Sequence, residues 1–167
     1  MLGGLMIASA FGLGVIYTGL HSYVVAKKQK VNKYTINKKN VDESISKILP
    51  NDVDIFYICN GDDLNHTCKS LSRTLSQYHI DGIRCHYASK GVCGLAYRGA
   101  NVTIIFVNNI LENYNLVSAR LKLYDTIFHE LYHILLDTSN EKTVSDMASK
   151  TIRRNKDKLL PAFVKID

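Results

Sequence analysis

The chain has 167 residues, a formal net charge of +6 and a hydrophobic content of 46%, which is ordinary for a globular protein and argues against wholesale disorder. Six lysines between residues 27 and 39 account for the excess of positive charge, so a nucleic-acid partner is not expected. The region that follows has about 130 residues, which suffices for one compact domain with its own core.

The N-terminal region is apolar and uncharged from residue 2 to residue 20. As a helix this run would rise about 28 Å, close to the hydrocarbon thickness of a bilayer. We therefore expect a transmembrane anchor over residues 1–26 that contacts the lipid bilayer through residues 2–26, a basic linker over 27–40 and a domain over 41–167. A cleaved signal peptide competes with this interpretation, because Val24-Val25-Ala26 offers a cleavage site, although no basic residue precedes the run. A buried core helix is the third interpretation.

The side of the membrane that holds the domain stays open. Lysines follow the apolar run but do not precede it, and the positive-inside rule then places the domain in the cytoplasm. The cysteines favour the other side, because Cys59 could pair with Cys68, and Cys85 with Cys93, in an oxidising compartment. Buried free thiols are the alternative for all four residues.

The remaining pattern predicts an α+β domain with a small mixed or antiparallel sheet. We expect a short helix over 41–49 capped by Asn40, and a helix that opens after the turn at 60–63. Strands are expected over 53–59, 80–88, 94–98 and 101–108. A long helix is expected over 116–136, and a last helix ends near residue 154. The core stripe of the long helix should comprise Leu121, Tyr124, Phe128, Leu131 and Leu135.

The segment His129-Glu130-Leu131-Tyr132-His133 carries the chemistry. Two histidines four residues apart project from one face of a helix, and their imidazoles can close on one Zn²⁺. Glu130 is rotated about 100° around the helix, so it can reach the open side of the metal without occupying it. There it can act as a general base toward water. A pair of surface histidines on a packing helix is the alternative interpretation.

On His129, Glu130 and His133 the sequence resembles the zincin metallopeptidases, which share the pattern His-Glu-x-x-His. The resemblance implies a peptide-cleaving zinc enzyme of zincin-like fold, with the motif on a helix. It also implies a preceding edge strand that pairs with the substrate, here residues 101–108. The third histidine of the metzincin branch is absent, which favours an acidic third ligand, as in gluzincin-like or aspartate-ligand zincins.

Asp146 and Glu141 are the candidates for that third ligand. If the last helix starts near Ser139 and runs back antiparallel, Asp146 lies about 10 Å along it, level with the space between the histidines. Glu141 lies nearer the turn, but its longer side chain reaches further. We expect Asp146 and keep Glu141 as the alternative, although glutamate is the usual ligand in the gluzincin branch.

These observations predict a membrane-tethered zinc metallopeptidase that acts on a peptide or protein substrate, with Glu130 as general base. The competing hypothesis is a non-catalytic, membrane-anchored binding domain with a structural or degenerate metal site.

Overall fold

The computed structural model describes residues 33–166. The predicted anchor over 1–26 therefore lies outside the described residues, and so does most of the predicted linker. Between residues 33 and 166, no helix combines the length and the apolar character needed to cross a membrane.

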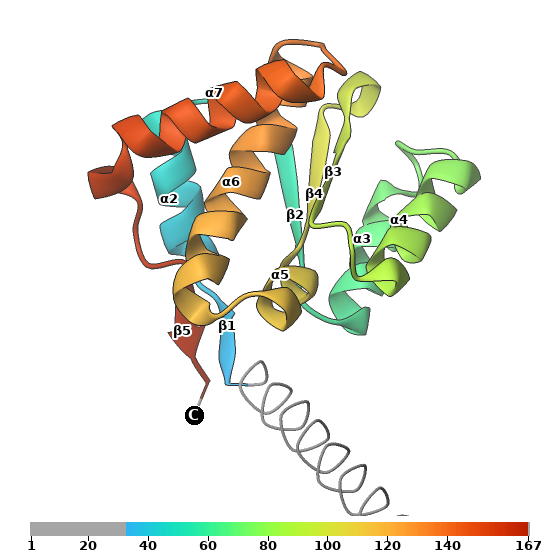
Figure 1. Cartoon of the computed structure of the whole chain (residues 1–167). Coiled ribbons are helices and arrows are strands. Elements are labelled where there is room, and N and C mark those ends of the chain that lie inside the picture. Colours follow the sequence, from blue (N-terminus) through green and yellow to red (C-terminus); the bar gives the residue numbers. More distant parts are fainter. Residues whose placement is uncertain (1–32, 167) are drawn as a thin grey trace, which may run out of the picture.

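The described residues form an α+β domain, as the sequence predicted (Figure 1). Its strands are β1 (Tyr34–Ile36), β2 (Asp54–Ile58), β3 (Gly94–Tyr97), β4 (Val102–Phe106) and β5 (Phe163–Lys165). Its α-helices are α2 (Lys38–Ile48), α3 (Gly61–Leu71), α4 (Gln77–Ser89), α5 (Val107–Asn113), α6 (Leu116–Leu135) and α7 (Glu141–Arg154). Two short 3-10 helices cover Arg98–Ala100 and Lys156–Lys158.

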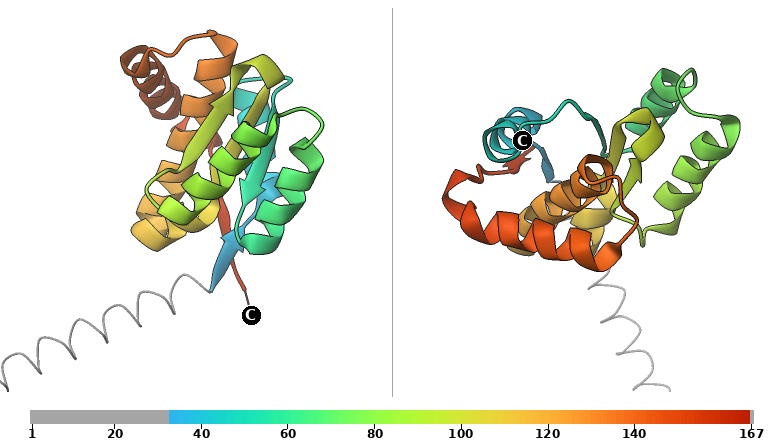
Figure 2. Two further views of the ribbon diagram at one scale, coloured as in Figure 1. Left: turned by 90° about the vertical axis from the view of Figure 1, so that its right-hand side faces the viewer. Right: turned by 90° about the horizontal axis from the view of Figure 1, so that it is seen from above.

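The main sheet is mixed and has the strand order β2-β4-β3. Strand β4 runs parallel to β2 and antiparallel to β3, so β4 is central and β3 is an edge. Because side chains alternate along a strand, Ile105 packs toward α6 whereas Ile104 and Phe106 pack toward α3 and α4. Figures 1 and 2 show the resulting layers, with α3 and α4 on one face of the sheet and α6 on the other.

A second, two-stranded sheet joins the two ends of the domain. Strand β1 pairs antiparallel with β5, and Thr35 lies opposite Val164. The segment before β5 is fastened to α2 and α6: the amide of Leu160 donates to Ser44 Oγ at 2.9 Å, and the Tyr124 hydroxyl donates to the Leu160 carbonyl at 2.9 Å. The predicted linker is therefore too long, since β1 begins at residue 34 and Asn37, not Asn40, caps α2.

Two predicted strands were wrong in part or whole. Residues 80–88 belong to helix α4, whose apolar residues Ile80 and Ile83 are buried at helical spacing. The strand expected over 101–108 ends at Phe106, and Val107 begins α5. In the long helix, Tyr124, Phe128 and Leu131 are fully buried as expected, but Leu121 and Leu135 are exposed.

All four cysteines are free in the structure, so the structure has the free thiols and not the two disulfides considered. Cys59 packs against the cluster on the α6 side of the sheet, whereas Cys68 belongs to the cluster on the α3 side. Cys85 is exposed on α4, and Cys93 packs on the α6 side. Cys85 does not lie on a strand next to Cys93, because residue 85 is helical.

Candidate metal centre

Helix α6 presents His129 and His133 on one face, one turn apart. Asn115 caps the helix by accepting from the Ser118 amide at 3.0 Å, and the opposite face is buried in the core. The two Nε2 atoms are 3.1 Å apart, and the ring planes meet at 75°. The rings therefore converge on one point, as the spacing predicted.

Glu141, the first residue of α7, completes this group. Its Oε2 lies 3.1 Å from His129 Nε2, and its Oε1 lies 3.3 Å from His133 Nε2. One ligand atom from each residue lies within 4.8 Å of the other two, so the three side chains could hold a metal ion. The two imidazoles are largely shielded, whereas the Glu141 side chain is 73% exposed.

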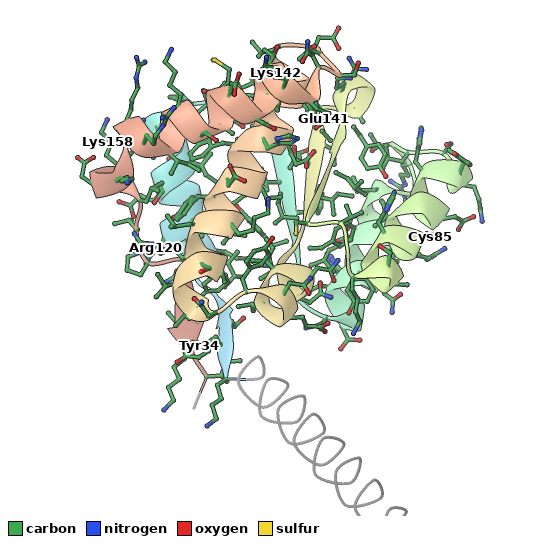
Figure 3. The ribbon with its side chains drawn as sticks, viewed as in Figure 1. Tyr34, Cys85, Arg120, Glu141, Lys142 and Lys158 are labelled. Carbon is green, nitrogen blue, oxygen red and sulfur yellow. The ribbon has the colours of Figure 1, made fainter. Side chains whose placement is uncertain are left out.

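Asp146 is not part of this group, so the structure gathers Glu141, the alternative ligand, and not the preferred one. The reason is that the last helix does not run back antiparallel along α6, as the sequence had led us to expect. Figure 1 shows α7 lying across the end of α6. Glu141 in the first turn of α7 therefore contacts both histidines. Asn140 caps α7 by accepting from the Thr143 amide at 3.1 Å, which fixes Glu141 in that turn. Figure 3 shows Glu141 where α7 begins, beside the end of α6.

Two groups orient the imidazoles. His133 Nδ1 lies 2.8 Å from the Thr138 carbonyl. A carbonyl only accepts, so Nδ1 carries the proton and Nε2 presents its lone pair to the candidate centre. Ser145 Oγ lies 3.4 Å from His129 Nδ1, where the hydroxyl can accept from a protonated Nδ1 and leave Nε2 free as a ligand. Burial, and then the nearby His133, lower the pKa of His129, which favours the neutral, ligating form.

Glu130 lies beside the candidate centre but not in it. Burial raises its pKa to about 7, and the nearby Glu141 carboxylate adds to the shift. Within residues 33–166 its carboxylate has no hydrogen bond and no ion pair, and it lines the cleft beside both histidines. A carboxylate of this kind exchanges protons near neutral pH, which suits a general base.

Gly94, at the start of β3, makes room for this carboxylate. A Cβ at this position would lie 2.7 Å from Glu130 Cγ and 2.7 Å from Thr126 Cγ2. Sequence reasoning missed Gly94, although a glycine in a strand signals close approach of another group. It also missed Thr138 and Ser145, whose roles depend on how α7 crosses α6.

The cleft at the centre has a volume of about 400 Å³, between β3 and the histidine face of α6. It shares Ala96 and Arg98 with a depression of about 720 Å³, and Gly94 and Glu130 with another of about 340 Å³. The three depressions adjoin one another through these residues of β3 and α6, and we call them together the groove. The sequence had placed the edge strand at 101–108, but that segment forms the central strand β4.

Comparison with known proteins gives no relative for this arrangement. No family model matches the chain, and no curated protein or solved structure matches it significantly.

Proposed function

We propose that the chain is a zinc-dependent peptidase in which His129, His133 and Glu141 bind the metal and Glu130 is the general base. One observation carries the proposal. The Nε2 atoms of His129 and His133 and the carboxylate of Glu141 lie 3.1–3.3 Å from one another. Next to them lies the Glu130 carboxylate, which has no partner among residues 33–166.

The donor set fits zinc. Two imidazole nitrogens and one carboxylate oxygen are the three protein ligands of many catalytic zinc sites, which keep the fourth position open. A bound zinc ion would act as a Lewis acid toward the substrate carbonyl and lower the pKa of water. Glu130 then takes a proton from the attacking water and delivers it to the leaving amine, a role that suits a pKa of about 7.

The groove supports an extended peptide as substrate. Strand β3 is an edge of the sheet and has unpaired backbone groups on its outer side. An extended chain can add to such an edge through main-chain hydrogen bonds. Because the groove continues on both sides of the histidines, it suits cleavage within a polypeptide. An antiparallel edge strand beside a metal-binding helix also extends the resemblance to zincins, and Glu141 agrees with the gluzincin pattern.

The membrane tether remains part of the proposal on the sequence alone. Residues 2–20 contain no charged side chain, and lysines follow them. This arrangement supports a single-pass anchor. The sequence is compatible with the peptidase domain on either side of the membrane.

Metal analysis and proteolysis of the purified full chain test the proposal. We expect one zinc ion per chain and cleavage of unstructured peptides. Glu130→Gln should keep the zinc and lose about 10²–10⁴-fold in kcat/KM, the usual contribution of a general base. Absence of zinc, or equal cleavage by the Glu130→Gln variant, contradicts the proposal. Zinc without cleavage by the unaltered chain favours the non-catalytic binding domain.

A further inference from the structure

The described domain has two chemically different ends. Tyr34 and Glu141 lie at opposite ends, with the candidate metal centre beside Glu141 (Figure 3). At the Tyr34 end the amide of Ile166 donates to the carbonyl of Lys33 at 2.7 Å. The chain that precedes residue 33 therefore joins the domain beside Ile166.

Exposed apolar side chains gather at the Tyr34 end, which we call the basal end. Four of the nine large apolar side chains that are exposed within residues 33–166 belong to it: Leu116, Val117, Val164 and Ile166. They come from the first turn of α6 and from β5 with the residue after it, segments that lie at the same end in Figures 1 and 2. Val117 is 76% exposed in the first turn of α6. Apolar side chains that gather in this way mark an interaction surface rather than scattered surface residues.

The sequence indicates which partner covers this surface. The uncharged run over residues 2–20 is joined to the basal end by only 12 residues, 21–32, which include Lys27, Lys28 and Lys30. Lys33 and Lys165 stand at the basal end itself. Apolar side chains bordered by lysines match the interface of a bilayer, where the chains enter the acyl boundary and the ammonium groups meet anionic headgroups.

We infer that the basal end rests on the lipid bilayer, with Val117, Leu116, Val164 and Ile166 inserted at the interface. This inference rests on the proposed membrane tether and is independent of the zinc chemistry. It also fixes the height of the groove. Helix α6 rises from Val117 to His129 and His133, which are 12 and 16 residues further along. At 1.5 Å per residue the candidate centre stands at most roughly 18–24 Å above the bilayer, the height it has if α6 is perpendicular to the surface. For the proposed peptidase, the substrate would then be a polypeptide whose scissile bond lies no higher than that.

The chain contains no tryptophan, so one introduced tryptophan reports on its own surroundings. The test uses full-length Val117→Trp in vesicles of phosphatidylcholine and phosphatidylglycerol, with and without brominated acyl chains. The matched control is Tyr78→Trp at a residue that is 83% exposed. Tyr78 lies away from the basal end. Its neighbour His79 accepts a hydrogen bond from Tyr97, and Tyr97 lies opposite Val102 at the start of β4, whereas α5 follows the other end of β4.

The inference predicts a blue-shifted emission for Val117→Trp that brominated lipid quenches, while Tyr78→Trp stays red-shifted and unquenched. Flotation of the vesicles separates the membrane tether from the contact of the basal end with the bilayer. If the chain floats but neither variant is quenched, or both are quenched equally, the basal contact is refuted and the tether stands. If Val117→Trp is blue-shifted without quenching, the surface contacts protein such as a second copy, and the inference fails. If the chain does not float, the tether and the basal contact both fail.

Discussion

The Glu141 carboxylate is 73% exposed, and at His133 it faces a ring nitrogen that presents a lone pair, so hydrogen bonding holds it there only weakly. The position of Glu141 makes chemical sense once a cation lies among the three side chains. We therefore predict that Glu141→Gln weakens zinc binding by more than about 100-fold, since even the loss of an outer-shell partner costs about 10–100-fold. Competition with a chromogenic chelator measures the dissociation constant.

Asp146→Asn is the matched comparison for that variant. The change removes one carboxylate from the same helix, outside the group that could hold the metal. It should leave the zinc affinity unaltered. Equal losses in both variants would mean that general electrostatics, not ligation, governs binding, and a reversed order would restore Asp146 as the ligand.

The raised pKa of Glu130 predicts a pH-dependent stability in the metal-free chain. The ordinary pKa of this carboxyl is 4.5, and burial raises it to about 7 in the folded state. The folded chain then binds the proton more tightly than the unfolded chain does, so stability falls as pH rises between these values. Glu130→Gln lacks this penalty. With chelator present it should be more stable than the unaltered chain above pH 7, by about 1–3 kcal/mol.

Urea denaturation at several pH values checks this prediction. The difference between the two chains should vanish below the ordinary pKa of 4.5, where Glu130 is protonated in both states. A difference that is constant with pH would show that the glutamine acts through packing and not through ionisation.

At the scale of elements, the approach of β3 to α6 builds the cleft. Gly94 and Ala96 face the helix, and their small size lets the strand pass close to Glu130. Gly94→Ala would place its Cβ 2.8 Å from Glu130 Oε1, so the carboxylate must move. We expect a large loss of cleavage, retained zinc, and a destabilisation of about 1–3 kcal/mol from overpacking.

Gly82→Ala is the control for backbone effects. A Cβ at Gly82 meets nothing within 4 Å, and the residue lies inside helix α4. This variant should be stabilised by about 0.5–1 kcal/mol, because alanine favours a helix interior. Kinetics, zinc content and melting curves of the two variants show whether Gly94→Ala acts through its contact with Glu130 or through the backbone. Unimpaired cleavage by Gly94→Ala would show that the close contact has no catalytic role.

The elements also show which features the sequence could predict. The two histidines and Glu130 follow from spacing on one helix, so local periodicity sufficed. The sequence predicts a strand over residues 80–88, because a short apolar stretch fits the period of a strand as well as that of a helix. In the structure these residues are helical, and Ile80 and Ile83 are buried one helical turn apart. The third ligand depended on the angle at which α7 meets α6, which no local pattern encodes. For the same reason the sequence does not give the order of the strands, and it placed the edge strand at 101–108 where the structure has the central strand β4.

At the scale of the whole molecule, the C-terminal segment ties distant parts of the chain together. Leu160 and its neighbours run between α2 and α6 before β5 pairs with β1. Helix α6 is thereby held at its N-terminal half by this segment, while its C-terminal half carries the histidines. The contacts that fasten the C-terminal segment and the histidines of the centre thus lie in different halves of one helix.

This separation predicts the outcome of Tyr124→Phe. Tyr124 is fully buried, and its hydroxyl donates to the Leu160 carbonyl at 2.9 Å and lies 3.1 Å from Ser44 Oγ. The variant keeps the ring but leaves the partly buried Leu160 carbonyl without this donor, which costs about 1–3 kcal/mol. Chemical denaturation should show this loss, while zinc content and kcat/KM stay unchanged, because the hydroxyl is more than one helical turn from His129.

Tyr78→Phe is the matched control, since it removes the same hydroxyl from a side chain that is 83% exposed and should leave stability unaltered. Equal stability of Tyr124→Phe and the unaltered chain would show that the C-terminal segment is not fastened to α6 in solution. A loss of zinc at unchanged stability would contradict the division of labour along α6, since packing at one end of the helix would then control ligand geometry at the other.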